Sequence, residues 1–80
     1  SDKPVIFPNP SKGEIKITAS AEWINTEFLI VNSLGQLVQN GIINERNTIL
    51  KTDNLAEGSY TLIIQSGEKK LYSQPFIHIK

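Results

Sequence analysis

The chain has 80 residues, of which 39% are hydrophobic and 20% charged, with eight basic side chains balancing eight acidic ones. This size and composition predict one small globular domain, and the balanced charge argues against a nucleic-acid binder. No apolar run reaches the roughly 20 residues that span a bilayer as a helix. The absence of cysteine excludes disulfides and thiolate metal sites, and the absence of methionine predicts a piece of a longer or processed protein.

The first quarter of the chain predicts an edge strand, a stiff turn and a half-buried strand. Residues 1–3 are a polar linker remnant without a signal-peptide pattern. Residues 4–7 are apolar and bracketed by prolines, which predicts an edge strand. Residues 8–13 are dense in turn residues, and residues 14–19 alternate between apolar and polar side chains.

The middle of the chain predicts a hairpin. Residues 20–25 form a turn or one loose helical turn with Trp23 as the only large group. The apolar run within residues 27–32 predicts a central strand covered on both sides. Residues 33–36 are a turn, and residues 37–38 return as the hairpin partner.

The sequence then predicts a bend, a loop and a further strand. Asn40 and Gly41 interrupt the chain, and residues 42–43 continue the sheet after a bulge or bend. Residues 44–47 are polar loop, and residues 48–52 alternate as a strand of uncertain facing.

Residues 53–65 form the most informative stretch, a turn that leads into an alternating strand. Tyr60, Leu62 and Ile64 share one face of this strand. Gly58 fits a positive φ or a close backbone approach, and Tyr60 after the turn is typical of the tyrosine corner of β-sandwiches.

The end of the chain predicts a hairpin turn and an interrupted strand. The turn is expected at residues 66–69, and residues 70–80 follow, with Pro75 requiring an edge position or a bulge. About seven short strands without helical periodicity predict an all-β, immunoglobulin-like antiparallel sandwich. We treat residues 1–80 as a single domain.

The sequence offers little for catalysis. His78 is the only histidine and has the pattern of a structural or surface residue, no serine lies in a nucleophile elbow, and the carboxylates are scattered. No calcium-loop or phosphate-binding glycine motif is present. We therefore predict a protein that is not an enzyme and binds no cofactor or metal.

Three features could contact a partner. Trp23 could stack on a sugar if it is exposed, although a core or edge-covering role is the simpler interpretation. Lys69 and Lys70 fit a solvated hairpin end, and the proline-rich loop at Pro8 is stiff enough to dock at little entropic cost.

Three blocks of sequence together resemble the type A C-terminal sorting domain of the type IX secretion system of Bacteroidetes. The first is Val-Ile-Phe-Pro-Asn-Pro at residues 5–10 with Gly13 shortly after. The second is Val-Asn-Ser-Leu-Gly-Gln-Leu-Val at residues 31–38. The third is Leu-Ala-Glu-Gly-Ser-Tyr-Thr-Leu-Ile-Ile at residues 55–64, followed by Gly67, the lysine pair and a terminal strand.

The resemblance implies a seven-stranded immunoglobulin-like fold and a non-enzymatic sorting function. Such domains end exported cargo proteins, are recognised in the periplasm by the translocon, and are commonly removed by a sortase-like cysteine peptidase, which leaves the cargo at the cell surface or outside the cell. By analogy, the cut would lie at or before residues 1–4. The positions that match the family and become recognition candidates are Pro8, Asn9, Pro10, Gly13, Gly35, Leu55, Gly58, Tyr60, Leu62, Lys69, Lys70 and Lys80.

The sequence departs from the family pattern before Gly35, where an acidic residue is common and Ser33 occupies the region. Two other functions remain open: a carbohydrate-binding sandwich that stacks sugars on Trp23 with Tyr60 or Tyr72, and an adhesive or spacer module of a surface protein.

Overall fold

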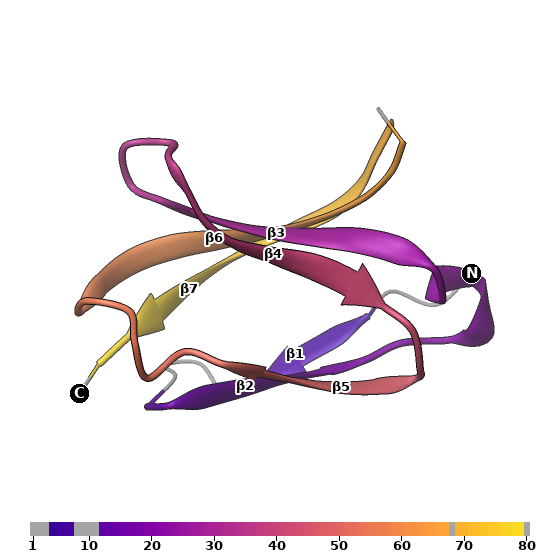
Figure 1. The fold of residues 1–80 in the computed structure, drawn as a ribbon, viewed down its shortest axis with the longest axis horizontal. Helices are drawn as coiled ribbons and strands as arrows, with labels where there is room; N and C mark the ends of the chain where they lie inside the picture. The colour runs from indigo at the N-terminus through magenta and orange to yellow at the C-terminus, as the bar shows by residue number, and fades with distance from the viewer. Residues whose placement is uncertain (1–3, 8–11, 68, 80) are drawn as a thin grey trace.

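The computed structural model describes residues 4–7, 12–67 and 69–79. In this part of the chain seven strands form two antiparallel sheets, which are the upper and lower layers of Figure 1. One short 3₁₀ helix connects two of the strands. The three-stranded sheet has the order β1-β2-β5, and the four-stranded sheet has the order β4-β3-β6-β7. This confirms the predicted sandwich. The elements are β1 Val5–Phe7, β2 Glu14–Thr18, η1 Ala21–Trp23, β3 Thr26–Asn32, β4 Leu37–Ile43, β5 Asn47–Lys51, β6 Gly58–Ser66 and β7 Lys69–His78.

The fourth strand decides which variant of the sandwich forms. β4 pairs with β3 in the four-stranded sheet and not with β5 in the other layer. This differs from the constant-type immunoglobulin arrangement, in which the fourth strand joins the first sheet. A short connection, residues 44–46, carries the chain from β4 to β5, so these two edge strands lie along the same side of the sandwich. On the other side, β7 faces β1, where Gln74 Nε2 donates to the Ile6 carbonyl at 3.5 Å.

Alternating side chains from both sheets fill the space between the layers. In β2 the apolar positions point inward, and in β6 the predicted face of Tyr60, Leu62 and Ile64 is buried. Because burial of apolar surface stabilises by roughly 25 cal/mol per Å², this alternation fixes which face of each strand points inward. The core side chains with no solvent exposure are Ile15, Ile17, Ile30, Ile43, Leu62 and Ile64.

The apolar run in β3 is central in its sheet, as predicted, but it is not covered on both faces. Phe28 and Ile30 are buried, whereas Leu29 and Val31 are half-buried on the outer face. Consecutive residues of a strand point to opposite faces, and no further layer covers the outer face of this sheet within the described residues. A continuous apolar run therefore does not establish two-sided burial.

The bend predicted at Asn40 and Gly41 is wrong, because β4 runs through both residues. Gly41 lies opposite Phe28, and a Cβ atom at position 41 would come within 2.7 Å of the Phe28 ring. The glycine is therefore required for the aromatic ring to lie over the neighbouring strand. The register shifts between Ile30 and Val31, which leaves Val38 as the extra residue of a bulge.

The interruption predicted at Pro75 is wrong, because β7 continues through this residue. The strand continues from Lys69 to His78, and Pro75 lies opposite Thr61 within it. Proline is tolerated because β7 is an edge strand, as the sequence required, so the missing N–H can face the side that has no neighbour. The irregularity lies elsewhere, at Leu71, where the register shifts between Ile64 and Gln65.

Candidate functional site: the two ends of the sandwich

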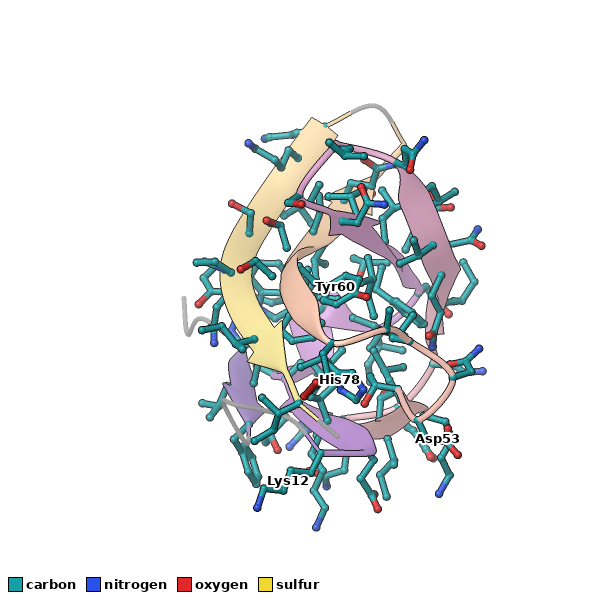
Figure 2. The ribbon with its side chains drawn as sticks, turned by 90° about the vertical axis from the view of Figure 1, so that its left-hand side faces the viewer. Lys12, Asp53, Tyr60 and His78 are labelled. Carbon is teal, nitrogen blue, oxygen red and sulfur yellow. The ribbon has the colours of Figure 1, made fainter. Side chains whose placement is uncertain are left out.

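Three of the loops that carry family-like sequence blocks meet at one end of the sandwich. Strand register places Asn32 opposite Tyr60 and His78 opposite Gly58, so β3 and β7 end where β6 begins. The Thr52 N–H donates to the Gly13 carbonyl at 2.8 Å, which brings the residues before β2 to the same end. We call this the motif end and define it by Gly13, the turn of residues 33–36, the corner of residues 52–58, and the C-terminal part of β7. Figure 2 looks onto it.

The predicted tyrosine corner is present at the motif end. The Tyr60 hydroxyl donates to the Ala56 carbonyl at 2.5 Å, and its ring stacks on Phe76 at a centroid distance of 5.7 Å. Leu55 is buried beneath this corner, and its N–H donates to the Thr52 carbonyl at 3.0 Å. A φ of +156° at Gly58 begins β6 after the corner, which confirms the positive φ predicted there. The corner therefore ties the loop to the core.

The β3–β4 turn is held by a residue that the sequence analysis did not single out. Asn32 Oδ1 accepts hydrogen bonds from the N–H groups of Leu34 and Gln36, each at 2.9 Å. A carboxylate at this place could accept the same two bonds, so Asn32 provides the acceptor that an acidic residue would supply. The sequence contained a signal for this turn, because an asparagine side chain often accepts a hydrogen bond from the backbone N–H two residues further along the chain, which is an Asx turn. Gly35 adopts a φ of +80° in this turn, as its position predicts.

A shallow apolar groove opens between the β3–β4 turn and the start of β6. Its volume is about 360 Å³, and its walls come from Ser33 on one side and from β6 and β7 on the other. Ile77 is 52% exposed along this groove. The remaining lining residues are Ser59, Tyr60, Thr61, Pro75 and Phe76.

The opposite end of the sandwich holds the lysine pair. Lys69 and Lys70 are exposed at the beginning of β7, beside the β6–β7 connection. The 3₁₀ helix closes the same end, where the Trp23 ring meets Tyr72 edge-on at a centroid distance of 6.4 Å. β1 also starts here, because Val5 pairs with Thr18 at the end of β2. We call this the hairpin end; Figure 1 shows it on the right, opposite the C-terminus.

Trp23 lies in the core and not on the surface. Trp23 is only 8% exposed, and Tyr60 has the same exposed fraction. The Thr26 hydroxyl donates to the Trp23 carbonyl at 2.6 Å, which fixes the 3₁₀ turn against β3. A sugar-stacking platform needs an exposed aromatic face, and neither residue presents one in this conformation.

The recognition candidates divide into three groups. Leu55, Tyr60 and Leu62 are buried in the core. Gly13, Gly35 and Gly58 shape the backbone of the motif end, whereas the lysine pair belongs to the hairpin end. Pro8, Asn9, Pro10 and Lys80 lie outside the described residues, as does the linker of residues 1–3.

His78 has a structural position. It is 1% exposed in β7, opposite Gly58, and Figure 2 shows it below Tyr60, between the sheets. Lys12 and Asp53 point outward at the rim of the same end. Among the described residues no three His, Cys, Asp or Glu side chains gather in a way that could hold a metal ion. The part of the chain that the structure describes also contains no helix of the length and hydropathy needed to cross a membrane.

Comparison with known proteins supplies one match. The family model described as a secretion system C-terminal sorting domain matches residues 5–78, which is nearly the whole chain. Searches of curated proteins and of solved structures found no significant match.

Proposed function

Because the chain belongs to the family of secretion system C-terminal sorting domains, we propose that it is the non-enzymatic address by which the type IX translocon recognises an exported protein in the periplasm. The observation that carries the proposal is the family match over residues 5–78. Members of this family direct secretion across the outer membrane to the cell surface.

The motif end is the surface that the translocon reads. The described chain begins beside the hairpin end, so an upstream cargo domain joins there, and the longest dimension of the domain, 32 Å, separates this cargo from the motif end. A partner at the motif end can therefore bind without touching the cargo. This arrangement suits an address that must work with unrelated cargo proteins.

The groove beside Ser33 gives the motif end a place for an apolar side chain of the partner. Its floor and walls come from β6 and β7, which are held by the tyrosine corner and by the stacked rings of Tyr60 and Phe76. Pre-organised surfaces lose little conformational entropy on binding.

The hairpin end is the surface used in the later step, the removal of the domain by the peptidase. A cut at or before residues 1–4 would fall upstream of Val5, and Val5 itself lies at the end of the domain where Lys69 and Lys70 are exposed. We assign the lysine pair to the sortase-like peptidase and the motif end to the translocon. The translocon and the peptidase would then bind opposite ends of one rigid domain.

The test is export of a fluorescent reporter that carries a periplasmic signal in front and residues 1–80 behind, in a host with an active type IX system. We expect the reporter at the cell surface or in the medium, and its loss when the machinery is disabled. A folded fusion that stays in the periplasm would refute the proposal. Deleting residues from 71 onward should also abolish export, but this removes most of β7 and unfolds the sheet, so point variants are needed to locate the surface.

One exposed isoleucine, Ile77, and one exposed valine, Val5, provide a matched pair of point variants. Ile77→Lys places a charge in the groove at a residue that is 52% exposed, and Val5→Lys places one on the other sheet at a residue that is 56% exposed. We expect the first to reduce export and the second to leave it unchanged. Replacing both lysines by glutamate should leave export intact and slow removal of the domain. Equal effects of Ile77→Lys and Val5→Lys would contradict the assignment to the motif end.

A further inference from the structure

The turn between β3 and β4 differs in sequence from the other connections of the sandwich. It reads Ser-Leu-Gly-Gln at residues 33–36, and no charged residue occurs between Glu27 and Glu45. Every other connection between the strands that the structure describes contains at least one charged residue in its sequence. Charged side chains keep the surface of a small domain soluble, so the β3–β4 turn is built for a different purpose.

Leu34 lies in this turn and is almost fully exposed to solvent. Its exposed fraction of 80% is the highest among the large apolar side chains of the described residues, followed by 56% for Val5. Leu37, the first residue of β4, is 54% exposed beside it in the sequence. A single exposed leucine is ordinary on a protein surface, so the argument depends on how its backbone is held.

Five hydrogen bonds from Asn32 hold the backbone of the turn. Besides the two that Oδ1 accepts from the N–H groups of Leu34 and Gln36, the Asn32 N–H donates to the Gln36 carbonyl and Nδ2 donates to Gln36 Oε1, each at 3.0 Å. The Gly35 N–H donates to the Asn32 carbonyl at 2.9 Å. The backbone of Leu34 is therefore fixed, although its side chain adds little to the core. Figure 1 shows the turn at the upper left, on the side of its sheet that faces away from the other layer.

We propose that Leu34 is the anchor by which the motif end inserts into an apolar, uncharged pocket of the translocon. This inference rests on the proposed function and names the side chain that the partner binds. Leu34 directly follows Ser33, a wall of the groove, so a partner that fills the groove also meets the leucine. A few well-packed side chains carry most of the energy of an interface, and a backbone that is already fixed loses little entropy on binding.

The chemistry of the turn favours a protein pocket over a lipid surface. Peripheral binding to a membrane requires a broad apolar face together with basic residues. The turn offers one leucine, and no lysine or arginine occurs between Lys16 and Arg46. A charge in the partner's pocket would be buried without a counter-charge, so the pocket must be uncharged.

Export of the reporter fusion measures the contribution of Leu34. The fusion is expressed at a low level, so that its export rate follows its affinity for the translocon. Leu34→Asn should lower this rate at least about 10-fold, because the apolar side chain is no longer buried in the pocket. Leu34→Met keeps the volume and the apolar character, and should retain most of the wild-type rate.

Ile49→Asn is the matched control. It removes an apolar side chain that is 54% exposed from β5, in the other sheet, and should leave the export rate unchanged. Circular dichroism verifies that all the variants are folded. A wild-type fusion that is not exported would overturn the proposed function and this inference with it. Wild-type export that Leu34→Asn leaves unchanged, or that both asparagine variants reduce equally, would overturn only the role of Leu34.

Photo-crosslinking identifies what covers Leu34. With p-benzoylphenylalanine in place of Leu34, irradiation of exporting cells should join the fusion to a translocon subunit, identified by mass spectrometry and absent when the machinery is disabled. The same replacement of Ile49 should not give this product. Crosslinks from position 34 only to lipid, or only to a second copy of the chain, would overturn the translocon pocket as the partner.

Discussion

The two ends of the sandwich are built differently, although each has one aromatic residue at the same low exposure. At the motif end the Tyr60 hydroxyl donates to the Ala56 carbonyl, the Thr52 N–H donates to the Gly13 carbonyl, and Asn32 Oδ1 accepts from N–H groups of its own turn. At the hairpin end, Trp23 packs on Tyr72 and its carbonyl accepts one hydrogen bond from the Thr26 hydroxyl, and the exposed lysines lie at the start of β7. Among the described candidates, Gly13, Gly35, Gly58 and Tyr60 therefore belong to loops of defined shape at the motif end, whereas Lys69 and Lys70 are exposed charges on a strand.

The largest expected effect comes from removing the aromatic residue at each end. Tyr60→Ala and Trp23→Ala each delete a buried ring and should lower the free energy of unfolding by about 3–5 kcal/mol. In a domain of this size that loss is comparable with the whole stability. Urea denaturation followed by circular dichroism measures it. A loss below about 1 kcal/mol at either position would show that the corresponding end is not anchored by its ring.

A smaller effect should follow from changing the β3–β4 turn. Asn32→Ala removes the acceptor for the Leu34 and Gln36 N–H groups and should cost about 1–2 kcal/mol, as the loss of a comparable helix cap does. Asn32→Asp retains an oxygen in the same place and serves as the matched control. The same denaturation experiment compares them. If both variants lose equal stability, the backbone bonds to Asn32 Oδ1 do not hold the turn.

Tyr60→Phe separates the hydroxyl from the ring. The ring and its stacking on Phe76 remain, and only the hydrogen bond to the Ala56 carbonyl is lost. We expect a decrease of about 1 kcal/mol in the free energy of unfolding. The ratio of this loss to that of Tyr60→Ala gives the share of the corner that depends on the hydroxyl, and no measurable loss would reduce the corner to apolar packing.

The smallest expected change is at the lysine pair. Replacing Lys69 and Lys70 by alanine removes exposed charges from the hairpin end and should alter stability by less than about 0.5 kcal/mol per residue. Thermal unfolding of the double variant measures this. A large loss of stability would mean that the lysines support the fold, and the contrast between the two ends would then disappear.

Local pattern predicted well where one face of a strand is buried. The alternation of Ile15 and Ile17 in β2 and of Tyr60 and Leu62 in β6 placed the core side chains correctly. It predicted poorly where two strands must accommodate each other. Gly41 is a turn signal in sequence, but in the fold it makes room for Phe28 on the adjacent strand. Pro75 is a strand breaker by type, but at an edge its missing N–H costs no ladder bond.

The sequence by itself determined the all-β class, the approximate number of strands, the tyrosine corner and, through three sequence blocks, the family. These follow from local alternation and turn chemistry, which depend on residues close together in the chain. Only the tertiary structure decided that β4 joins β3 and that separate blocks meet at one end. Those features depend on which strands become neighbours, and neighbours far apart in sequence are chosen by the packing of the whole core.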